Sequence, residues 1–126
     1  MGRFIWNVRF NRDNYFSFFG NNIYFVENRY QAGMSFYLTR TLRWDGSIVF
    51  GRNKYPELQQ ISLPDGGYEE ISREDDFRTL TTGLVVRVLR STGIGLSVNF
   101  WRHKSNYFNW GTRSNMVISG YVTYDF

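Results

Sequence analysis

The chain has 126 residues, the size of a single domain, and a formal net charge of +4. It contains no cysteine, which excludes disulfides, thiolate chemistry and cysteine-ligated metal sites. No run of about 18 apolar residues is present, so we expect no transmembrane helix. The basic residues are scattered rather than clustered, and we therefore expect no nucleic-acid partner.

The first two strands are predicted at residues 3–19 and 23–39. In the first, aromatic and aliphatic side chains alternate with polar ones, and this period of two predicts one apolar and one polar face. Gly20-Asn21-Asn22 supplies the turn between the strands, because Gly and Asn tolerate positive φ. The second strand alternates in the same way from Tyr30 onward.

The third and fourth strands are predicted at residues 42–54 and 77–89, with a tight turn near Arg40-Thr41 before the third. Residues 54–75 contain both prolines, an Asp-Gly-Gly turn and most of an acidic run that reaches Asp76. We expect this segment to be a long solvated loop, because Pro and Gly interrupt strands and no apolar alternation is visible.

The last two strands are predicted at residues 93–103 and 113–126. A tight turn at 89–92 precedes them, and a medium loop at 104–111 joins them. The final strand alternates from Met116 to the terminal residue, and about ten residues suit a tilted strand that crosses a bilayer.

Apolar side chains occupy even-numbered positions in all six predicted strands, and tight turns alternate with longer connections, as in transmembrane barrels. Aromatic residues make up 20% of the chain, yet its mean hydropathy is only −0.42. We therefore predict one all-β domain over residues 1–126, an antiparallel up-and-down transmembrane β-barrel or a six-stranded part of one. The aromatic residues predicted to face lipid are Phe4, Trp6, Tyr30, Trp44, Phe50, Phe100, Tyr124 and Phe126.

The six predicted strands do not decide whether the barrel closes, because the smallest single-chain membrane barrels have about eight strands. Unpaired N–H and C=O groups in lipid are costly, so any open edge must be covered. The chain either closes on itself or is completed by further chains or copies. A soluble β-barrel that binds an apolar ligand, with its apolar face inward, is a third interpretation.

The polar face of the predicted strands is rich in arginine. A lumen with a surplus of positive charge would favour anions. The alternatives are that these arginines pair with carboxylates or with lipid phosphates near the rims. The arginines predicted to face the lumen are Arg3, Arg9, Arg29, Arg43, Arg87 and Arg113.

The C-terminal third carries a family resemblance. Its last strand ends on Tyr124 and Phe126, and this ending resembles the assembly signal of bacterial outer-membrane β-barrels. Gly95-Leu96-Ser97, Lys104-Ser105-Asn106 and Arg113-Ser114-Asn115 are similar to the last strands of the β-barrel porin family of Gram-negative outer membranes. The resemblance implies a location in the bacterial outer membrane and a porin-like channel or an export conduit. It implies the barrel assembly machinery and outer-membrane lipid or lipopolysaccharide as partners, and no catalytic residue.

The single histidine, His103, is the one candidate for catalysis, with Asp75, Asp76 and Ser105 as potential partners. No nucleophile motif, phosphate-binding loop or metal-ligand cluster accompanies it. We expect His103 to be a rim residue of a polar loop, and we expect no enzyme activity, no metal and no cofactor. The function expected is that of an outer-membrane channel or transport component, and the alternative is a structural or assembly module.

Overall fold

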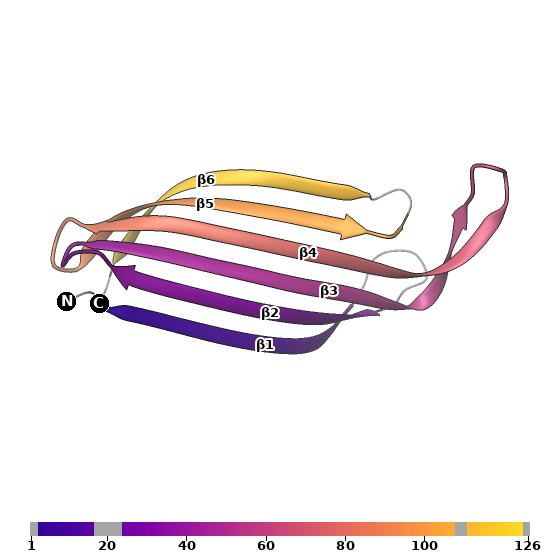
Figure 1. The fold of residues 1–126 in the computed structure, drawn as a ribbon, viewed down its shortest axis with the longest axis horizontal. Coiled ribbons are helices and arrows are strands. Elements are labelled where there is room, and N and C mark those ends of the chain that lie inside the picture. Colours follow the sequence, from indigo (N-terminus) through magenta and orange to yellow (C-terminus); the bar gives the residue numbers. More distant parts are fainter. Residues whose placement is uncertain (1–2, 17–23, 108–110, 125–126) are drawn as a thin grey trace.

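The computed structural model describes residues 3–16, 24–107 and 111–124. Six strands form one antiparallel sheet in the order of the sequence (Figure 1), which confirms the predicted all-β, up-and-down topology. No helix within the described ranges is long and apolar enough to span a membrane. The strands are β1 (Phe4–Phe16), β2 (Tyr24–Tyr37), β3 (Leu42–Ser62), β4 (Tyr68–Arg87), β5 (Thr92–Ser105) and β6 (Thr112–Tyr124).

The register gives the sheet two distinct faces. Even-numbered residues oppose even-numbered residues in every ladder, as where Phe36 lies between Phe4 and Trp44. The register shift between Lys54 and Leu58 adds two residues to β3, so the parity is unchanged beyond it. Because successive side chains in a strand point to opposite faces, all even-numbered side chains of the sheet share one face.

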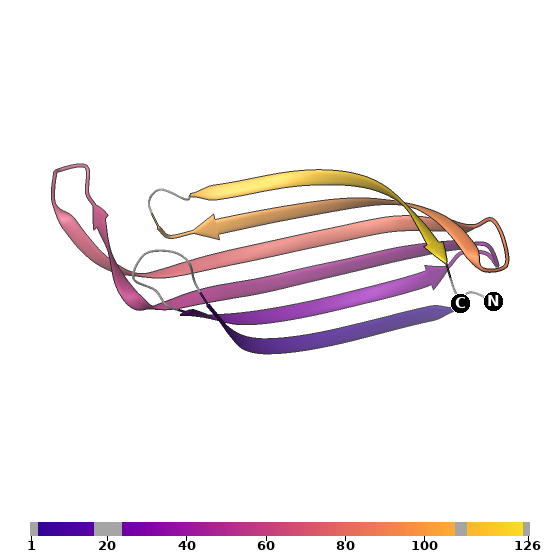
Figure 2. The same cartoon turned by 180° about the vertical axis from the view of Figure 1, so that it is seen from behind.

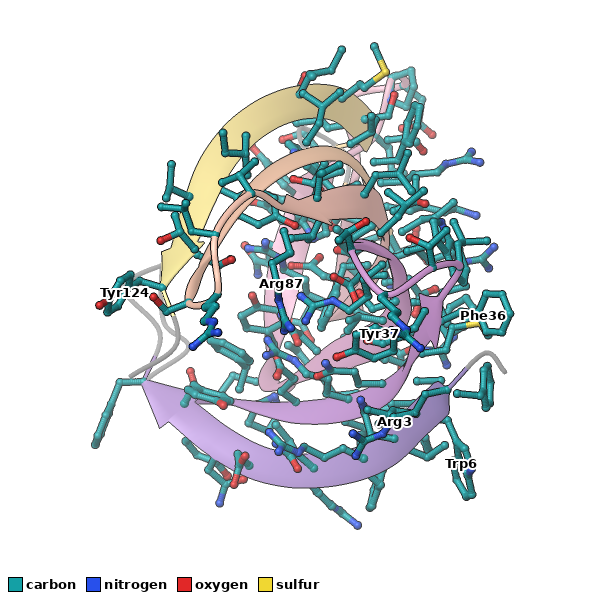
Figure 3. The ribbon with its side chains drawn as sticks, turned by 90° about the vertical axis from the view of Figure 1, so that its left-hand side faces the viewer. Arg3, Trp6, Phe36, Tyr37, Arg87 and Tyr124 are labelled. Carbon is teal, nitrogen blue, oxygen red and sulfur yellow. The ribbon has the colours of Figure 1, made fainter. Side chains whose placement is uncertain are left out.

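The sheet is strongly curved, and Figure 3 shows which side chains point inward. Arg3, Tyr37 and Arg87 point to the concave side, whereas Trp6, Phe36 and Tyr124, all even-numbered, point outward. The odd-numbered face is therefore the concave face, and the even-numbered face is the convex one.

Curvature crowds the concave face, and Gly95 shows how the sequence accommodates this crowding. The ring of Tyr121, the residue opposite, lies across it, so that a Cβ at Gly95 would be 2.4 Å from the Tyr121 Cζ atom. Only glycine leaves space for the ring at this position.

The sheet does not close into a barrel. The described residues of β1 and β6 make no contact, so each of these strands has one unpaired edge. The ladder bond from the Tyr37 N–H to the Arg3 carbonyl shows that odd-numbered residues of β1 face β2. The N–H and C=O groups of the even-numbered residues therefore point to the open edge. On β6 the Ser105 N–H donates to the carbonyl of Gly111, so the odd-numbered residues face β5. The N–H and C=O groups of the even-numbered residues of β6 therefore also point to an open edge.

The prediction of a long loop at residues 54–75 is wrong, because most of this segment continues β3 and β4. The extended hairpin projects beyond the other strands (Figures 1 and 2). Pro56 lies inside the register shift of β3, where a missing N–H interrupts no ladder bond. The turn at 63–67 has Gly66 at a φ of +87°, which favours glycine. The acidic run accordingly lies on β4 and is not a loop.

The tight turn between β2 and β3 is held by the Thr39 hydroxyl, which accepts bonds from the backbone N–H groups of Thr41 at 3.2 Å and Leu42 at 3.0 Å. The predicted turn Gly20-Asn21-Asn22 and the terminal Phe126 lie outside the described residues.

The molecule exposes far more surface than a water-soluble domain of its mass. Its accessible surface is 9575 Å², whereas about 7,000 Å² is expected for a folded monomer of 15.0 kDa. Among the described hydrophobic residues, only Tyr55 and Val85 are buried. The sheet therefore has no conventional hydrophobic core, and its two faces are the surfaces that matter.

Candidate functional site

The convex face carries a continuous apolar band. Three of its residues, Val8, Trp6 and Val122, are exposed to 71%, 68% and 71%. Rows of directly opposed residues run across all the strands of the sheet, and one of them, which we call the apolar row, is apolar throughout. This row consists of Val8, Ala32, Ile48, Leu80, Phe100 and Met116.

The band ends abruptly toward the extended β3–β4 hairpin, which we call the hairpin end. Two rows beyond the apolar row, every residue on the convex face is polar or charged. This polar row consists of Arg12, Asn28, Arg52, Asp76, Lys104 and Thr112. Its charges pair with one another, since the Arg52 Nε atom lies 2.7 Å from an Asp76 carboxylate oxygen. The convex face is therefore polar or charged at this row on every strand of the sheet.

The extent of the apolar band can be measured along β3. On β3 it extends over the nine residues from Leu42 to Phe50. At about 3.3 Å per residue this distance is about 26 Å along the strand. A tilt of about 40° reduces it to about 20 Å, close to the apolar band of about 25 Å on transmembrane barrels.

Aromatic side chains gather near the two limits of this band. Phe10 and Tyr30 lie next to Phe50 in the row nearest the hairpin end, and the ring centroids of Phe10 and Tyr30 are 4.8 Å apart. Trp44 lies near the opposite limit, where its indole N–H donates a 2.9 Å hydrogen bond to the Thr82 hydroxyl. The residues predicted to face lipid that the structure describes all lie on the convex face, namely Phe4, Trp6, Tyr30, Trp44, Phe50, Phe100 and Tyr124.

The concave face is polar and carries paired charges. The Arg43 guanidinium binds the Asp45 carboxylate at 3.0 Å, and the Ser35 hydroxyl donates to the same carboxylate at 2.6 Å. Arg29 binds Glu27 at 2.9 Å. Two of the arginines predicted to face the lumen are thus paired with carboxylates two residues away, which was one of the alternatives. Glu27 was missed by the sequence reasoning, although its odd number already placed it on this face.

The predicted arginines share the concave side of the sheet. Arg87 points inward near the tight turns, and Arg3 lies just before β1 on the same side (Figure 3). By residue parity all six are on that side, and these residues are Arg3, Arg9, Arg29, Arg43, Arg87 and Arg113.

A cluster of polar side chains, the Asp75 cluster, is buried where the β3–β4 hairpin leaves the sheet. Asp75 is 1% exposed, and Arg73 donates to both of its carboxylate oxygens at distances of 2.7 to 3.1 Å. The Ser105 hydroxyl also donates to Asp75, and the Arg73 guanidinium lies 4.5 Å from the centroid of the Tyr55 ring. Burial, with a smaller contribution from the negative charge of Asp75, raises the pKa of Tyr55 to about 12.

The Asp75 cluster brings together three of the four residues considered for catalysis, Asp75, His103 and Ser105. They are not arranged as a catalytic triad. The His103 Nε2 atom lies 3.7 Å from Asp75, beyond hydrogen-bond distance. Ser105 binds the carboxylate directly, whereas a triad needs the histidine between acid and nucleophile. Asp76 lies on the opposite face and pairs with Arg52. The hydrogen bond from Ser105 to Asp75 instead links β5 to β4.

No group of three or more acidic, histidine or cysteine side chains that could hold a metal ion occurs in the described part of the chain. Comparison of the chain with protein-family models, curated proteins and solved structures found no match.

Proposed function

We propose that this chain forms part of the wall of a transmembrane β-barrel in a bacterial outer membrane, with the convex band against lipid and the concave face toward a water-filled lumen. The single observation that carries the proposal is the apolar band on the outside of the sheet, cut off by one polar row across all the strands. Spanning strands need such a band, because lipid-facing and lumen-facing residues alternate.

The polar concave face favours a channel or transport component. Arg43, Asp45 and Ser35 form a hydrogen-bonded group there, and charged groups on the wall of a pore influence ion selectivity. A soluble barrel that binds an apolar ligand would need the opposite arrangement, with large apolar residues inside and charges outside.

The two open edges imply partner strands. On β1 and β6, eight residues of the band direct N–H and C=O groups to an edge with no strand beside it, and each unpaired group in lipid costs several kcal/mol. Both edges expose the backbone of even-numbered residues, so an antiparallel strand added to either edge extends the same outer band. Further copies or other chains of the same alternating pattern complete the barrel. The eight band residues whose backbone groups point to an open edge are Phe4, Trp6, Val8, Phe10, Met116, Ile118, Gly120 and Val122.

Two neighbouring residues on opposite faces provide a matched test. Leu80 lies in the convex band, and Thr81 lies on the concave face. We expect Leu80→Arg to lower the yield of membrane-inserted, heat-modifiable protein, since an arginine on the lipid face of a barrel costs up to about 2–4 kcal/mol, depending on its depth. Thr81→Arg should insert as the wild type does. Equal insertion of both variants, or a wild type that stays monodisperse without detergent, would overturn the proposal.

Conductance in planar bilayers separates a channel from a structural or assembly module. A channel should show discrete conductance steps with an anion preference that Arg87→Gln reduces, because this side chain points into the concave space. Stable insertion without conductance would instead favour the module that anchors partner chains.

A further inference from the structure

Two arginines stand side by side on the convex face, at the limit of the apolar band. Arg78 on β4 is directly opposite Arg102 on β5. The Cβ atoms of such a pair are about 5 Å apart, and like charges in this position destabilise a sheet. Their row lies between the apolar row and the polar row. In the proposed membrane orientation, the pair is therefore a concentration of positive charge at the height where a bilayer changes from acyl chain to headgroup.

The carboxylates nearest to this pair in the described part of β4 are bound by other cations. Asp76, two residues from Arg78 on the same face, is bound by Arg52 at 2.7 Å. Glu74, the next acidic residue of β4 on this face, is bound by Lys54 at 3.1 Å. The Arg78 guanidinium lies 6.0 Å from the centroid of the Phe50 ring, which supports it from the apolar side.

An apolar hollow adjoins the two arginines. It has a volume of about 640 Å³, and Arg78 and Arg102 form part of its lining. The rest of its lining is mostly apolar and includes Ile48, Leu80, Phe100 and Met116. These residues belong to the apolar row next to the arginine pair, so the hollow runs from the arginines into the band.

We propose that this surface binds an anionic lipid, with its phosphate on Arg78 and Arg102 and an acyl chain in the hollow. Guanidinium groups bind phosphate through paired, charge-assisted hydrogen bonds, and two of them match the charge of a phosphate monoester or two phosphodiesters. The occupant is an amphiphile rather than a free anion, because the charged and apolar parts of the surface are contiguous. This inference rests on the proposed membrane location and names the lipid class that the outer surface selects.

The test measures retained lipid by native mass spectrometry after reconstitution in nanodiscs that mix phosphatidylglycerol and phosphatidylcholine. We expect the wild type to retain the anionic lipid selectively. Arg78→Gln and Arg102→Gln should each weaken this retention about tenfold, as expected when one charge-assisted bond is lost. Arg12→Gln is the matched control, because Arg12 lies on the convex face in the polar row of β1, away from the hollow.

The outcomes separate this inference from the proposed function. Insertion of all variants with equal retention of both lipids would overturn the lipid site and leave the barrel intact. Failure of the wild type to enter nanodiscs would overturn both. Displacement of the bound lipid by millimolar inorganic phosphate would show a simple anion site and would also overturn the proposal. An unchanged Arg12→Gln protein, together with weakened lipid retention in the other two variants, is the supporting result.

Discussion

The indole N–H of Trp44 donates a 2.9 Å hydrogen bond to the hydroxyl of Thr82, on the neighbouring strand and on the convex face of the sheet. The ring reaches Thr82 by lying across Gly46, the residue opposite Thr82. Apolar residues surround the pair, including Trp6, Met34 and Leu80, so the bond satisfies the polar groups of both side chains within the apolar band.

Replacement of Thr82 by valine tests the environment of this bond. In lipid, Thr82→Val should lower the free energy of unfolding by about 1–3 kcal/mol, because the indole N–H loses its partner where water cannot replace it. Urea titration of the protein in lipid vesicles, followed by tryptophan fluorescence, measures the effect. In the Trp44→Phe background the same substitution should be almost neutral. A loss below about 0.5 kcal/mol in both backgrounds would mean that water reaches the convex face.

Gly95 and Tyr121 give a prediction for the concave face. Gly95→Val should destabilise the sheet by about 1–3 kcal/mol, because the new side chain occupies the space of the Tyr121 ring. Removal of the ring by Tyr121→Ala should recover part of this loss in the double variant. The thermal midpoint of all three variants in detergent gives the coupling energy. Strict additivity of the two substitutions would contradict the packing described for this pair.

Asp75 and Asp76 are adjacent in sequence and lie on opposite faces, which makes them a matched pair. Asp75→Asn should cost about 3–5 kcal/mol, because it removes the carboxylate that the buried Arg73 guanidinium binds. Asp76→Asn should cost about 1 kcal/mol or less, since its bond to Arg52 is exposed to water. Chemical denaturation and limited proteolysis of the β3–β4 hairpin measure the two effects. Equal costs would contradict the burial of the Asp75 cluster.

The raised pKa of Tyr55 predicts a loss of stability in alkali. The folded protein holds this phenol neutral up to about pH 12, whereas an unfolded chain ionises it near its ordinary pKa of 10.0. Its contribution to stability is therefore complete below about pH 10 and disappears as the pH rises through the folded pKa. Tyr55 lies beyond the polar row, outside the apolar band, so its titration is measurable in detergent.

The measurement is a difference ultraviolet titration between the wild type and Tyr55→Phe. One phenol that ionises about two pH units above the ordinary tyrosine value should be present only in the wild type. The variant should also lose less stability than the wild type between pH 10 and 12. An identical titration of both proteins would refute the assignment.

Local alternation in the sequence was sufficient to determine the two faces of the sheet. A strand turns its side chains alternately to either side, so the even-numbered positions of Trp6, Trp44 and Leu80 already placed them on one surface. Short turns near 41 and 90 then made neighbouring strands antiparallel and kept the parity constant. The apolar side of each strand therefore needed no tertiary information.

The tertiary structure alone decided the features that depend on pairing between distant residues. Residues 54–62 and 68–75 lack an apolar alternation, and their strand character comes from ladder bonds with each other, with Pro56 accommodated in a register shift. The meeting of Asp75 with Ser105 depends on the register of β4 against β5, which no local pattern encodes. The open edges of β1 and β6 are likewise a property of the whole sheet, because its curvature determines whether its first and last strands meet.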